Sequence, residues 1–508
     1  MQKRGLISVY DKSGIAALAR FLADEGYKLL STGGTFGLLH SKGVPVEEVS
    51  EYTGLAECLD GRVKTLHPKI YGGILGRRDD ADHLNMMSAQ GMDPIDVVVV
   101  NLYPFFEKSA QGLDIEALTE FIDIGGSALI RAAAKNHAHV TVLTSPADYA
   151  PLMEEWRSSE GGLSMNTRRR LAGKAFALSG AYDAAISHSI LGDDEAPEIL
   201  NRSYRKAFGL RYGENPHQQA AYYIPISKND FGALSDLQQH QGKELSHNNL
   251  RDLDSAWRTV NEFDDGACVG VKHAAPCAAA LAPTPLASWS RVFKADPVSI
   301  FGGIVAFNRE VDEETARALN NLFLEVIAAP GYSREAMKVF SSKKTLRVLS
   351  MTRLPCDRWE TLPVDGGLCL QRVDGNCVDE AQWTVPTKVK PTAQQRFDMN
   401  FAWRVVKHVK SNGIVLASDG FTAGIGSGQP NRIGAVNIAI ASAGAKADGA
   451  VMASDAFFPF DDAVKAAADA GVKAVIQPGG SIRDEDSIRV CDEQGLTMVL
   501  TGRRHFRH

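Results

Sequence analysis

The sequence predicts an α/β protein of more than one domain. Short apolar runs typical of buried strands alternate with amphipathic helical stretches along most of the chain. A chain of 508 residues is too long for one core, and its length suggests two to four domains. The acidic, turn-rich stretch at residues 192–197 has no periodicity, so we predict a first domain of residues 1–198 and a second of residues 199–508.

The first domain shows the alternation of strands and helices most clearly. Ile15, Leu18 and Leu22 recur at helical spacing within residues 13–25. Four consecutive valines follow Asp96, which is typical of a strand buried on both faces. The predicted elements are strands at residues 6–9, 27–30, 96–100 and 140–143, and helices at residues 13–25, 127–137 and 166–191.

Two stretches near the start of the chain are typical of anion sites. Ser31–Thr35 follows a strand and opens a helix, so its backbone N–H groups could face a phosphate; a plain tight turn is the alternative. Residues 60–68 contain Arg62, Lys64 and Thr65, which could surround a phosphate or a polar purine ring. The alternative for this second stretch is a solvated basic loop.

Two later stretches of the first domain extend this interpretation. The buried strand at residues 96–100 leads into Asn101–Phe105, and ligands of open α/β sheets lie at the carboxyl ends of strands. Asp123–Gly126 opens a helix that carries Arg131 and Lys135 one turn apart, which we interpret as a second candidate anion site. Together with the earlier turn, these features favour a phosphorylated substrate.

The second domain is organised around Val271–Cys277. Residues 267–270 predict a buried strand, and Pro276 is expected to end its ladder because proline has no N–H to donate. Lys272 beside His273 at the end of a strand indicates proton-transfer chemistry, since histidine titrates near neutral pH. A structural or surface pair is the alternative interpretation.

The second domain also contains a possible internal duplication. Residues 269–276 and residues 449–460 share the outline of a strand followed by a polar loop. Two further glycine-rich turns are expected at residues 424–429 and 477–481. Phe457, Phe458 and Phe460 are interpreted as core residues.

Composition and motifs exclude several classes of function. A net charge of −6 argues against a general nucleic-acid binder, and no apolar segment approaches the roughly 20 residues that span a bilayer. Without a signal peptide, and with seven scattered cysteines, the chain is expected in the reducing cytoplasm. Pro276-Cys277 is similar to half of the zinc-deaminase signature, but position 280 is alanine, so we expect no catalytic metal. The glycine-rich turns match neither the Walker A nor the dinucleotide-binding motif.

Taken in order, these motifs closely resemble one family over essentially the whole chain. The stretches that carry the resemblance are residues 31–35, 60–68, 101–105, 123–126, 135–137, 210–218, 271–276, 454–460 and 504–508. The family combines AICAR transformylase with IMP cyclohydrolase in purine biosynthesis. The resemblance implies a methylglyoxal-synthase-like N-terminal domain and a C-terminal pair of cytidine-deaminase-like subdomains without zinc.

The resemblance further implies two reactions and a homodimer with transferase sites shared between subunits. The larger domain would transfer a formyl group from 10-formyltetrahydrofolate to AICAR, and the N-terminal domain would close the resulting FAICAR to IMP. Carried over by position, Lys135 would be the acid/base of ring closure, with Tyr103 and Lys64 polarising the formyl oxygen. The implied ligands of the nucleotide are Lys12, Thr32, Gly33, Gly34, Thr35, Arg62, Val63, Thr65, Asn101, Asp123 and Ile124.

In the transferase, the resemblance implies that His273 takes the proton from the AICAR amine and that Lys272 stabilises charge on the formyl oxygen. Both reactions are additions to a formyl carbonyl, which need proton transfer and an oxyanion partner. The implied AICAR ligands are Arg211, Tyr212, Gly302, Glu325, Asn412 and Arg432. The implied folate ligands are Phe457, Gly479, Gly480 and Arg504.

The sequence departs from the family pattern in a few positions. Tyr10 stands where a small serine is usual in the phosphate loop, and Asp461 stands where an arginine is usual near the folate site. An alternative is a phosphometabolite-sensing regulatory domain fused to a folate-dependent transferase. Because sensing needs the phosphate loops alone, the presence of Lys64, Tyr103 and Lys135 favours the enzyme. A purine-ring hydrolase is the third possibility, disfavoured by the missing metal ligands.

Overall fold

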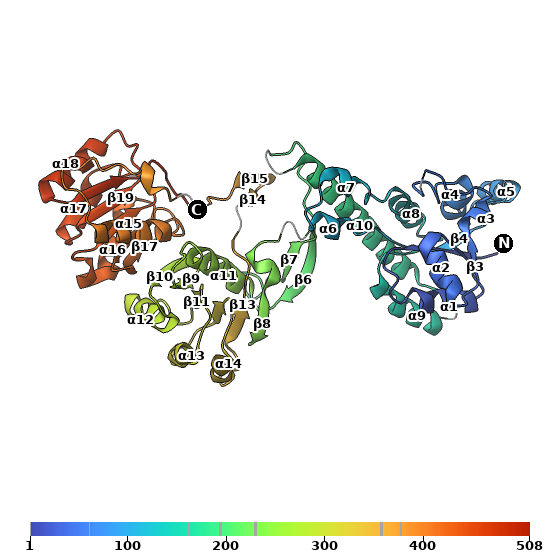
Figure 1. Cartoon of the computed structure of the whole chain (residues 1–508), viewed down its shortest axis with the longest axis horizontal. Coiled ribbons are helices and arrows are strands. Elements are labelled where there is room, and N and C mark those ends of the chain that lie inside the picture. Colours follow the sequence, from blue (N-terminus) through green and yellow to red (C-terminus); the bar gives the residue numbers. More distant parts are fainter. Residues whose placement is uncertain are drawn as a thin grey trace. The chain divides into compact units, whose positions relative to one another are not determined.

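The computed structural model divides the chain into two compact units (Figure 1): Met1–Arg205 with Pro225–Asp230, and Lys206–Ile224 with Phe231–His508. It describes residues 2–59, 61–159, 162–192, 196–227, 231–355, 359–375 and 378–508. Asp60 and the acidic residues 193–195 of the predicted boundary lie outside the described residues, as do Cys356 and Cys377.

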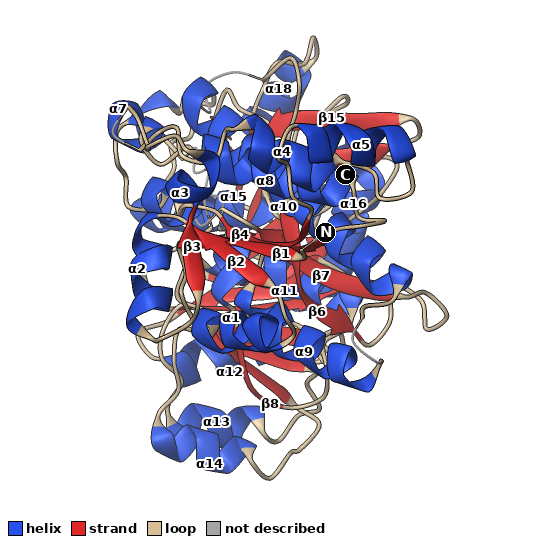
Figure 2. Ribbon diagram, turned by 90° about the vertical axis from the view of Figure 1, so that its right-hand side faces the viewer, coloured by secondary structure: helices blue, strands red, loops and turns tan. Residues whose placement is uncertain are grey.

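The first unit is a parallel sheet with helices on both faces, an α/β fold as predicted. Its strand order is β3 (Val46–Glu48), β2 (Lys28–Ser31), β1 (Arg4–Val9), β4 (Ile95–Asn101) and β5 (Thr141–Leu143), and Figure 2 shows the first four side by side. The helices are α1 (Ile15–Asp24), α2 (Gly33–Ser41), α3 (Val49–Thr53), α4 (Pro68–Leu75), α5 (Ala81–Ala89), α6 (Phe105–Ser109), α7 (Ile115–Thr119), α8 (Ile124–Lys135), α9 (Tyr149–Ser158) and α10 (Met165–Leu191).

Alternate residues of the central strand β4 supply two core clusters of this unit, one on each face of the sheet. Val97 and Val99 pack against α1 and α9, whereas Val98 and Val100 pack against α4, α8 and α10. Because successive side chains of a strand point to opposite faces, four valines in a row are what a doubly covered strand requires. The helix predicted over residues 13–25 is confirmed as α1, in which Ile15, Leu18 and Leu22 are fully buried.

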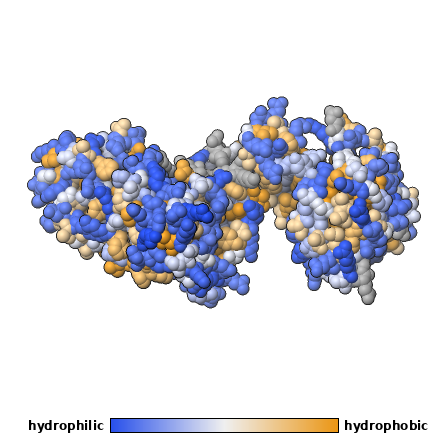
Figure 3. All heavy atoms as spheres, turned by 60° about the horizontal axis from the view of Figure 1, so that its bottom comes forward, coloured by the Kyte–Doolittle hydropathy of each residue, from blue (hydrophilic) through white to orange (hydrophobic). Residues whose placement is uncertain are grey.

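The second unit is built on an 11-stranded sheet. The strand order is β20 (Thr497–Leu500), β19 (Ala474–Gln477), β18 (Val451–Ser454), β16 (Ile414–Ser418), β17 (Phe421–Gly426), β10 (Ala275–Leu281), β9 (Ala267–Lys272), β11 (Ile304–Phe307), β12 (Val326–Ala329), β13 (Arg347–Ser350) and β8 (Gln238–Gln241). Two-stranded sheets pair β6 (Tyr204–Leu210) with β7 (Ala220–Pro225) and β14 (Trp359–Val364) with β15 (Gly367–Arg372). Hydrophilic and hydrophobic residues are interspersed on the face that Figure 3 shows.

Helices cover both faces of the large sheet. The helices α11 (His247–Val260) and α15 (Ala393–Val406) share one core cluster on one face. The other face carries two clusters, one under α12 (Pro285–Ala295), α13 (Glu313–Leu319) and α14 (Arg334–Phe340), and one under α16 (Arg432–Ala443), α17 (Asp462–Asp469) and α18 (Asp484–Gln494).

The sheet contains an internal duplication, but not in the register predicted from the sequence. The antiparallel hairpin β9–β10 is followed by the parallel strands β11, β12 and β13, and the hairpin β16–β17 is followed by β18, β19 and β20 in the same arrangement. The counterpart of β9 is therefore β16, whereas residues 449–460 contain the counterpart of β11. The outline of a strand followed by a polar loop could not identify the true counterpart of β9, because both copies contain several strands of that form.

Proline does not end the strand at residue 276. The chain turns at His273–Ala274 and returns as β10, in which Pro276 pairs with Val271 beside a register shift. Bulges of this kind are where a sheet tolerates proline.

Candidate functional site

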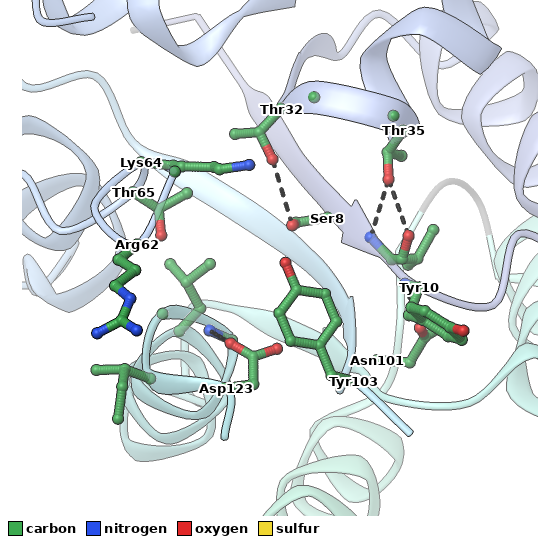
Figure 4. Close-up of a pocket in the computed structure, with 18 of the residues that line it drawn as sticks. Ser8, Tyr10, Thr32, Thr35, Arg62, Lys64, Thr65, Asn101, Tyr103 and Asp123 are labelled. Atoms are coloured by element: carbon green, nitrogen blue, oxygen red, sulfur yellow. Dashed lines mark hydrogen bonds between the residues drawn. The ribbon is translucent and has the colours of Figure 1, made fainter. Parts of the chain in front are cut away.

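A cavity of about 670 Å³ lies at the carboxyl ends of β1, β2 and β4 in the first unit. Strand order reverses around β1, since β2 lies on one side of it and β4 on the other. Ligands of open α/β sheets bind at such a switch point. Polar side chains from five separate segments line the cavity, and Figure 4 shows them converging on one space.

The first turn of α2 faces two lysines across this cavity. A Cβ atom built on Gly33 would lie 3.7 Å from Lys64 Nζ, and one built on Gly34 would lie 3.9 Å from Lys12 Nζ. Thr32 is the N-cap residue, and its side chain makes no capping hydrogen bond. A helix N-terminus flanked by two ammonium groups is suited to bind an anion, and glycines would let the anion approach the backbone closely.

Asn101 holds the loop that carries Lys12. Its Oδ1 accepts hydrogen bonds from the backbone N–H groups of Tyr10 and Asp11 at 2.6 and 2.9 Å, and its Nδ2 donates to the Asp11 carbonyl at 3.0 Å. The carboxamide lines the cavity, yet most of its hydrogen-bonding capacity serves this loop.

Tyr103 follows β4 and is half-exposed in the cavity. Its ring meets the ring of Tyr10 edge to face, with centroids 6.1 Å apart and an interplanar angle of 85°. Figure 4 shows the Tyr103 hydroxyl and the Lys64 ammonium pointing into the same space near Thr32. A hydroxyl and an ammonium in such positions are suited to polarising a carbonyl oxygen.

Asp123 lies beneath this space and caps α8. Its Oδ1 accepts a hydrogen bond from the Gly126 N–H at 2.6 Å. Burial raises the pKa of its carboxyl group, against the backbone N–H groups of Gly126 and Tyr103 that lower it. The second anion site expected here stays a prediction: the start of α8 already holds its own carboxylate, and Arg131 lies over the ring of Phe176 at 5.9 Å.

Most of the residues implied for this site line the cavity. They are Lys12, Thr32, Gly33, Gly34, Thr35, Arg62, Lys64, Thr65, Asn101, Tyr103, Asp123 and Ile124. Thr35 is buried and bonds the backbone of Val9 through its hydroxyl, so its contribution is to hold α2 on β1. The exposed Arg62 is paired with Glu120.

Val63 and Lys135 are not among the residues that line the cavity. Lys135 is the last residue of α8, roughly 16 Å along the helix axis from the end that meets the cavity. The resemblance transferred its role by position in the sequence, and the helix separates that position from the site within this unit. Val63 instead pairs with Cys58 in an isolated bridge.

Tyr182 supports the site but was missed from the sequence. Its hydroxyl accepts a hydrogen bond from the Asp123 N–H at 2.9 Å and donates to the Phe121 carbonyl at 2.7 Å. It lies deep within the long helix α10, where the sequence pattern predicts that an aromatic residue packs in the hydrophobic core. Ser8 was missed for a similar reason, since it stands inside a predicted strand.

In the second unit, Lys272 is the last residue of β9 and His273 follows it, so both lie at the carboxyl end of this central strand. His273 and Ala274 are the two central residues of the hairpin turn, with φ angles of 55° and 56°. His273 is exposed, and Lys272 donates a hydrogen bond from Nζ to the Phe301 carbonyl at 2.8 Å.

Four of the implied AICAR ligands lie at the same end of the sheet's strands. The Gly302 N–H donates to the Phe323 carbonyl at 2.8 Å, and Glu325 pairs with the buried Arg347 at 2.6 Å. Arg211 and Tyr212 bond the backbone of residues 245–247, which follow β8. Parallel pairing of β11, β12 and β13 explains this grouping, because their amino ends and the carboxyl end of β9 lie together.

The remaining implied ligands lie in loops and at helix starts that flank the strands of the second half of the sheet. Asn412 donates from Nδ2 to the Gln429 carbonyl at 2.7 Å, and Arg432 is buried in an ion pair with Asp455. The Gly480 N–H donates to Asp484 at 2.6 Å, in a turn where Gly479 and Gly480 both have positive φ angles.

The aromatic predictions for this segment are divided. Phe458 is fully buried, as predicted, whereas Phe457 and Phe460 are exposed. Arg504 is exposed and lies over the ring of Phe506 at 4.7 Å.

Among the described residues, no group of three histidine, cysteine, aspartate or glutamate side chains is arranged to hold a metal ion. Nor does that part of the chain contain a helix both long and apolar enough to span a membrane.

Comparisons with known proteins cover the whole chain. The AICARFT/IMPCHase bienzyme family matches residues 133–442, and the MGS-like domain matches residues 14–128. The "Bifunctional purine biosynthesis protein PurH" of Clostridium botulinum strain Okra is 49% identical over 509 residues, and that of Fusobacterium nucleatum is 48% identical over 510 residues; each alignment covers 100% of both chains. A solved structure titled "Crystal structure of ForH" is 36% identical over 37% of this chain and 97% of its own, with a TM-score of 0.34.

Proposed function

The chain belongs to the AICARFT/IMPCHase bienzyme family, and on that premise we propose which of its residues carry out each of the two reactions. It is a bifunctional enzyme of purine biosynthesis, with AICAR transformylase and IMP cyclohydrolase activities, and the transformylase uses a formyl-folate co-substrate.

Ring closure takes place in the cavity of the first unit. The phosphate of FAICAR binds at the start of α2 between Lys12 and Lys64. The carboxamide nitrogen attacks the formyl carbon while Tyr103 and Lys64 stabilise charge on the formyl oxygen, and the adduct loses water to give IMP. The observation that supports this assignment is the convergence of Tyr103 and Lys64 beside an uncapped helix start.

Asp123 is the proton-transfer group that we assign in place of Lys135. Its carboxyl group lines the cavity, and burial raises its pKa above the ordinary value, which favours proton exchange with substrate. Lys135 stands at the other end of α8, so a role for it would require a second chain.

Formyl transfer takes place at the carboxyl end of β9. His273 takes the proton from the AICAR amine as its nitrogen attacks the formyl carbon of 10-formyltetrahydrofolate, and Lys272 stabilises the developing oxyanion. The bond between the formyl carbon and N10 then breaks, and N10 takes up the proton from His273 as tetrahydrofolate leaves. The left-handed conformation of His273 supports this role, because backbone strain of this kind is concentrated at functional sites.

We also propose a homodimer that shares these transferase sites. Glu325 precedes β12 and Asn412 precedes β16, and five strand intervals separate these strands, roughly 24 Å at the usual spacing. One AICAR molecule cannot touch both within a single sheet. A second copy that contributes its Asn412 segment would complete the site.

The test is a coupled assay of the purified protein with AICAR and 10-formyltetrahydrofolate. Wild type should form IMP, Tyr103→Phe should accumulate FAICAR, and His273→Ala should cut transfer by about 10²–10⁴-fold while still cyclising added FAICAR. Equal loss of both activities in well-folded variants would refute the division of the residues between two sites.

A further inference from the structure

The turn that carries His273 has an unusual sequence for its conformation. Two consecutive residues with positive φ angles define the type I′ turn, which favours Asn-Gly or Asp-Gly. Here the two residues are His273 and Ala274, and the left-handed conformation is strained for each because neither is glycine. Other contacts must therefore hold this turn in place.

Helix α11 supplies these contacts. Asp252 Oδ1 accepts a hydrogen bond from the Ala274 N–H at 2.5 Å, and Ser255 Oγ donates to the Ala274 carbonyl at 3.2 Å. These two side chains stand three residues apart and so lie on one face of the helix. Both backbone polar groups of Ala274 are thus bound by side chains from α11. Burial raises the pKa of the Asp252 carboxyl group, whereas its contact with the turn lowers it.

The internal duplication provides a natural comparison. The hairpin β16–β17 turns at Asp419–Gly420, with φ angles of 59° and 70°, and the Gly420 N–H donates to Asp398 Oδ1 at 2.8 Å. Asp252 and Asp398 are each the sixth residue of their helix, α11 and α15. The helix-to-turn bond is therefore common to both halves of the sheet.

The two copies differ where the chemistry lies. The second copy has glycine in the strained position, and Phe401 replaces Ser255 at the ninth position of the helix. The first copy has two non-glycine residues in its turn, His273 and Ala274, and the side chains of Asp252 and Ser255 hold this turn.

We propose that Asp252, assisted by Ser255, is a positioning residue for formyl transfer that fixes His273 in the left-handed turn where its imidazole meets the substrate amine. The proposal rests on the proposed function of His273. A base must lie within hydrogen-bond reach of its proton, and a misplacement of about 1 Å can cost 10²-fold in rate.

The experiment measures kcat and KM of formyl transfer, with cyclisation of FAICAR as an internal control in the same protein. Asp252→Ala should lower kcat for transfer by about 10–10²-fold with little change in KM, and leave cyclisation intact. Asp252→Asn retains an acceptor oxygen and should keep activity within about 3-fold, as expected when one hydrogen bond is preserved.

Relief of the backbone strain gives a second readout. The double variant Asp252→Ala/Ala274→Gly should recover much of the lost kcat, because glycine adopts the turn without the support of Asp252. The matched control is Asp398→Ala, which removes the equivalent bond from the half without His273 and should leave kcat for transfer within a few-fold of wild type.

Three results would overturn the proposal: unchanged kcat in Asp252→Ala, an equal loss in Asp398→Ala, or a double variant no more active in formyl transfer than Asp252→Ala. A folded wild type that fails to transfer formyl would instead refute the proposed function itself.

Discussion

Asn101 Oδ1 accepts a hydrogen bond of 2.6 Å from the backbone N–H of Tyr10, and so ties the carboxyl end of β4 to the loop after β1. This loop brings Lys12 to the first turn of α2. Asn101→Ala should therefore raise KM for FAICAR about 10-fold or more, since an unsatisfied loop lets Lys12 move. Steady-state cyclisation kinetics test this. Asn101→Asp keeps the hydrogen-bond acceptor but not the donor, so its KM for FAICAR should lie between those of wild type and Asn101→Ala. A change in kcat alone would contradict the positioning role.

The two lysines that face α2 should act as phosphate ligands. Lys12→Ala and Lys64→Ala should each weaken FAICAR binding by about 10–100-fold, the value of a charge-assisted hydrogen bond. Lys64→Ala should in addition lower kcat, because this lysine also meets the formyl oxygen. Lys42→Ala, at the opposite end of the same helix, is the matched control. Inhibition of cyclisation by inorganic phosphate should weaken in the first two variants and not in the control.

The charged carboxylate of Asp123 should lower the free energy of unfolding of the first unit, although it supports cyclisation of FAICAR. Because burial raises its pKa, the native state retains this proton at pH values where the unfolded chain has lost it. The charged carboxylate therefore costs stability above the raised pKa, and the cost disappears as the pH falls below the ordinary value of 3.8.

Asp123→Asn should then reduce cyclisation by about 10²-fold without lowering Tm at pH 8. Asparagine still caps α8 through its side-chain oxygen. Thermal unfolding between pH 4 and 8 is the measurement, and the Tm difference between variant and wild type should narrow toward the acidic end. A lower Tm of the variant at pH 8 would show that the carboxylate is needed for folding.

Some parts of the fold could be predicted from sequence patterns, and others could not. Periodicity located the strands and α1 because burial repeats regularly along the chain, and the turn before α2 followed from its glycines. Gly424 and Gly426 were expected in a turn, yet they lie in β17, where a Cβ atom would approach the Ala439 and Ala435 carbonyls of α16 to 2.2 and 1.9 Å. Glycine serves turns and close helix–strand packing alike, so the sequence alone cannot separate them.

The supports of the site were harder to predict than its reactive residues. Asp252 and Tyr182 lie within long helices, and their roles depend on which turn each helix crosses. That information exists only in the packing. The position of Lys135 was unpredictable for the same reason, since its distance from Asp123 is set by a helix and not by its neighbours in the sequence.

A buried cluster joins the two halves of the large sheet. Glu262, just after α11, accepts hydrogen bonds at 2.8 Å from Lys407 and His408, which follow α15. Glu262→Gln would leave a buried ammonium without its counter-charge and should destabilise the second unit by about 3–5 kcal/mol. Glu313→Gln, which breaks the exposed pair with Arg317, should cost about 0–1 kcal/mol. Chemical denaturation of both variants tests the contrast.

The same cluster should make the second unit sensitive to acid. Burial raises the pKa of Glu262, but the hydrogen bonds and charges of His408 and Lys407 outweigh it and hold the pKa at about 2, below the ordinary 4.5. Burial lowers the pKa of His408 from 6.5. In both cases the unfolded chain binds more protons, so stability should fall as the pH drops through 6.5 and further between 4.5 and 2. The lower step should be absent in Glu262→Gln.

The first unit should fold and cyclise FAICAR as an isolated fragment of residues 1–198. Core clusters on both faces of its sheet draw on α10 through Leu171 and Ala175, and α10 also supplies Tyr182, whose hydroxyl accepts a hydrogen bond from the Asp123 N–H. A fragment of residues 1–158 keeps the sheet and the lysines but loses this helix, so it should neither melt cooperatively nor turn over FAICAR. Circular dichroism melts and a cyclisation assay of both fragments, beside the full chain, give the comparison. An inactive 1–198 fragment that melts cooperatively would show that the cyclohydrolase needs more than this unit, such as Lys135 from a second chain; an active 1–158 fragment would show that α10 and Tyr182 are dispensable for the site.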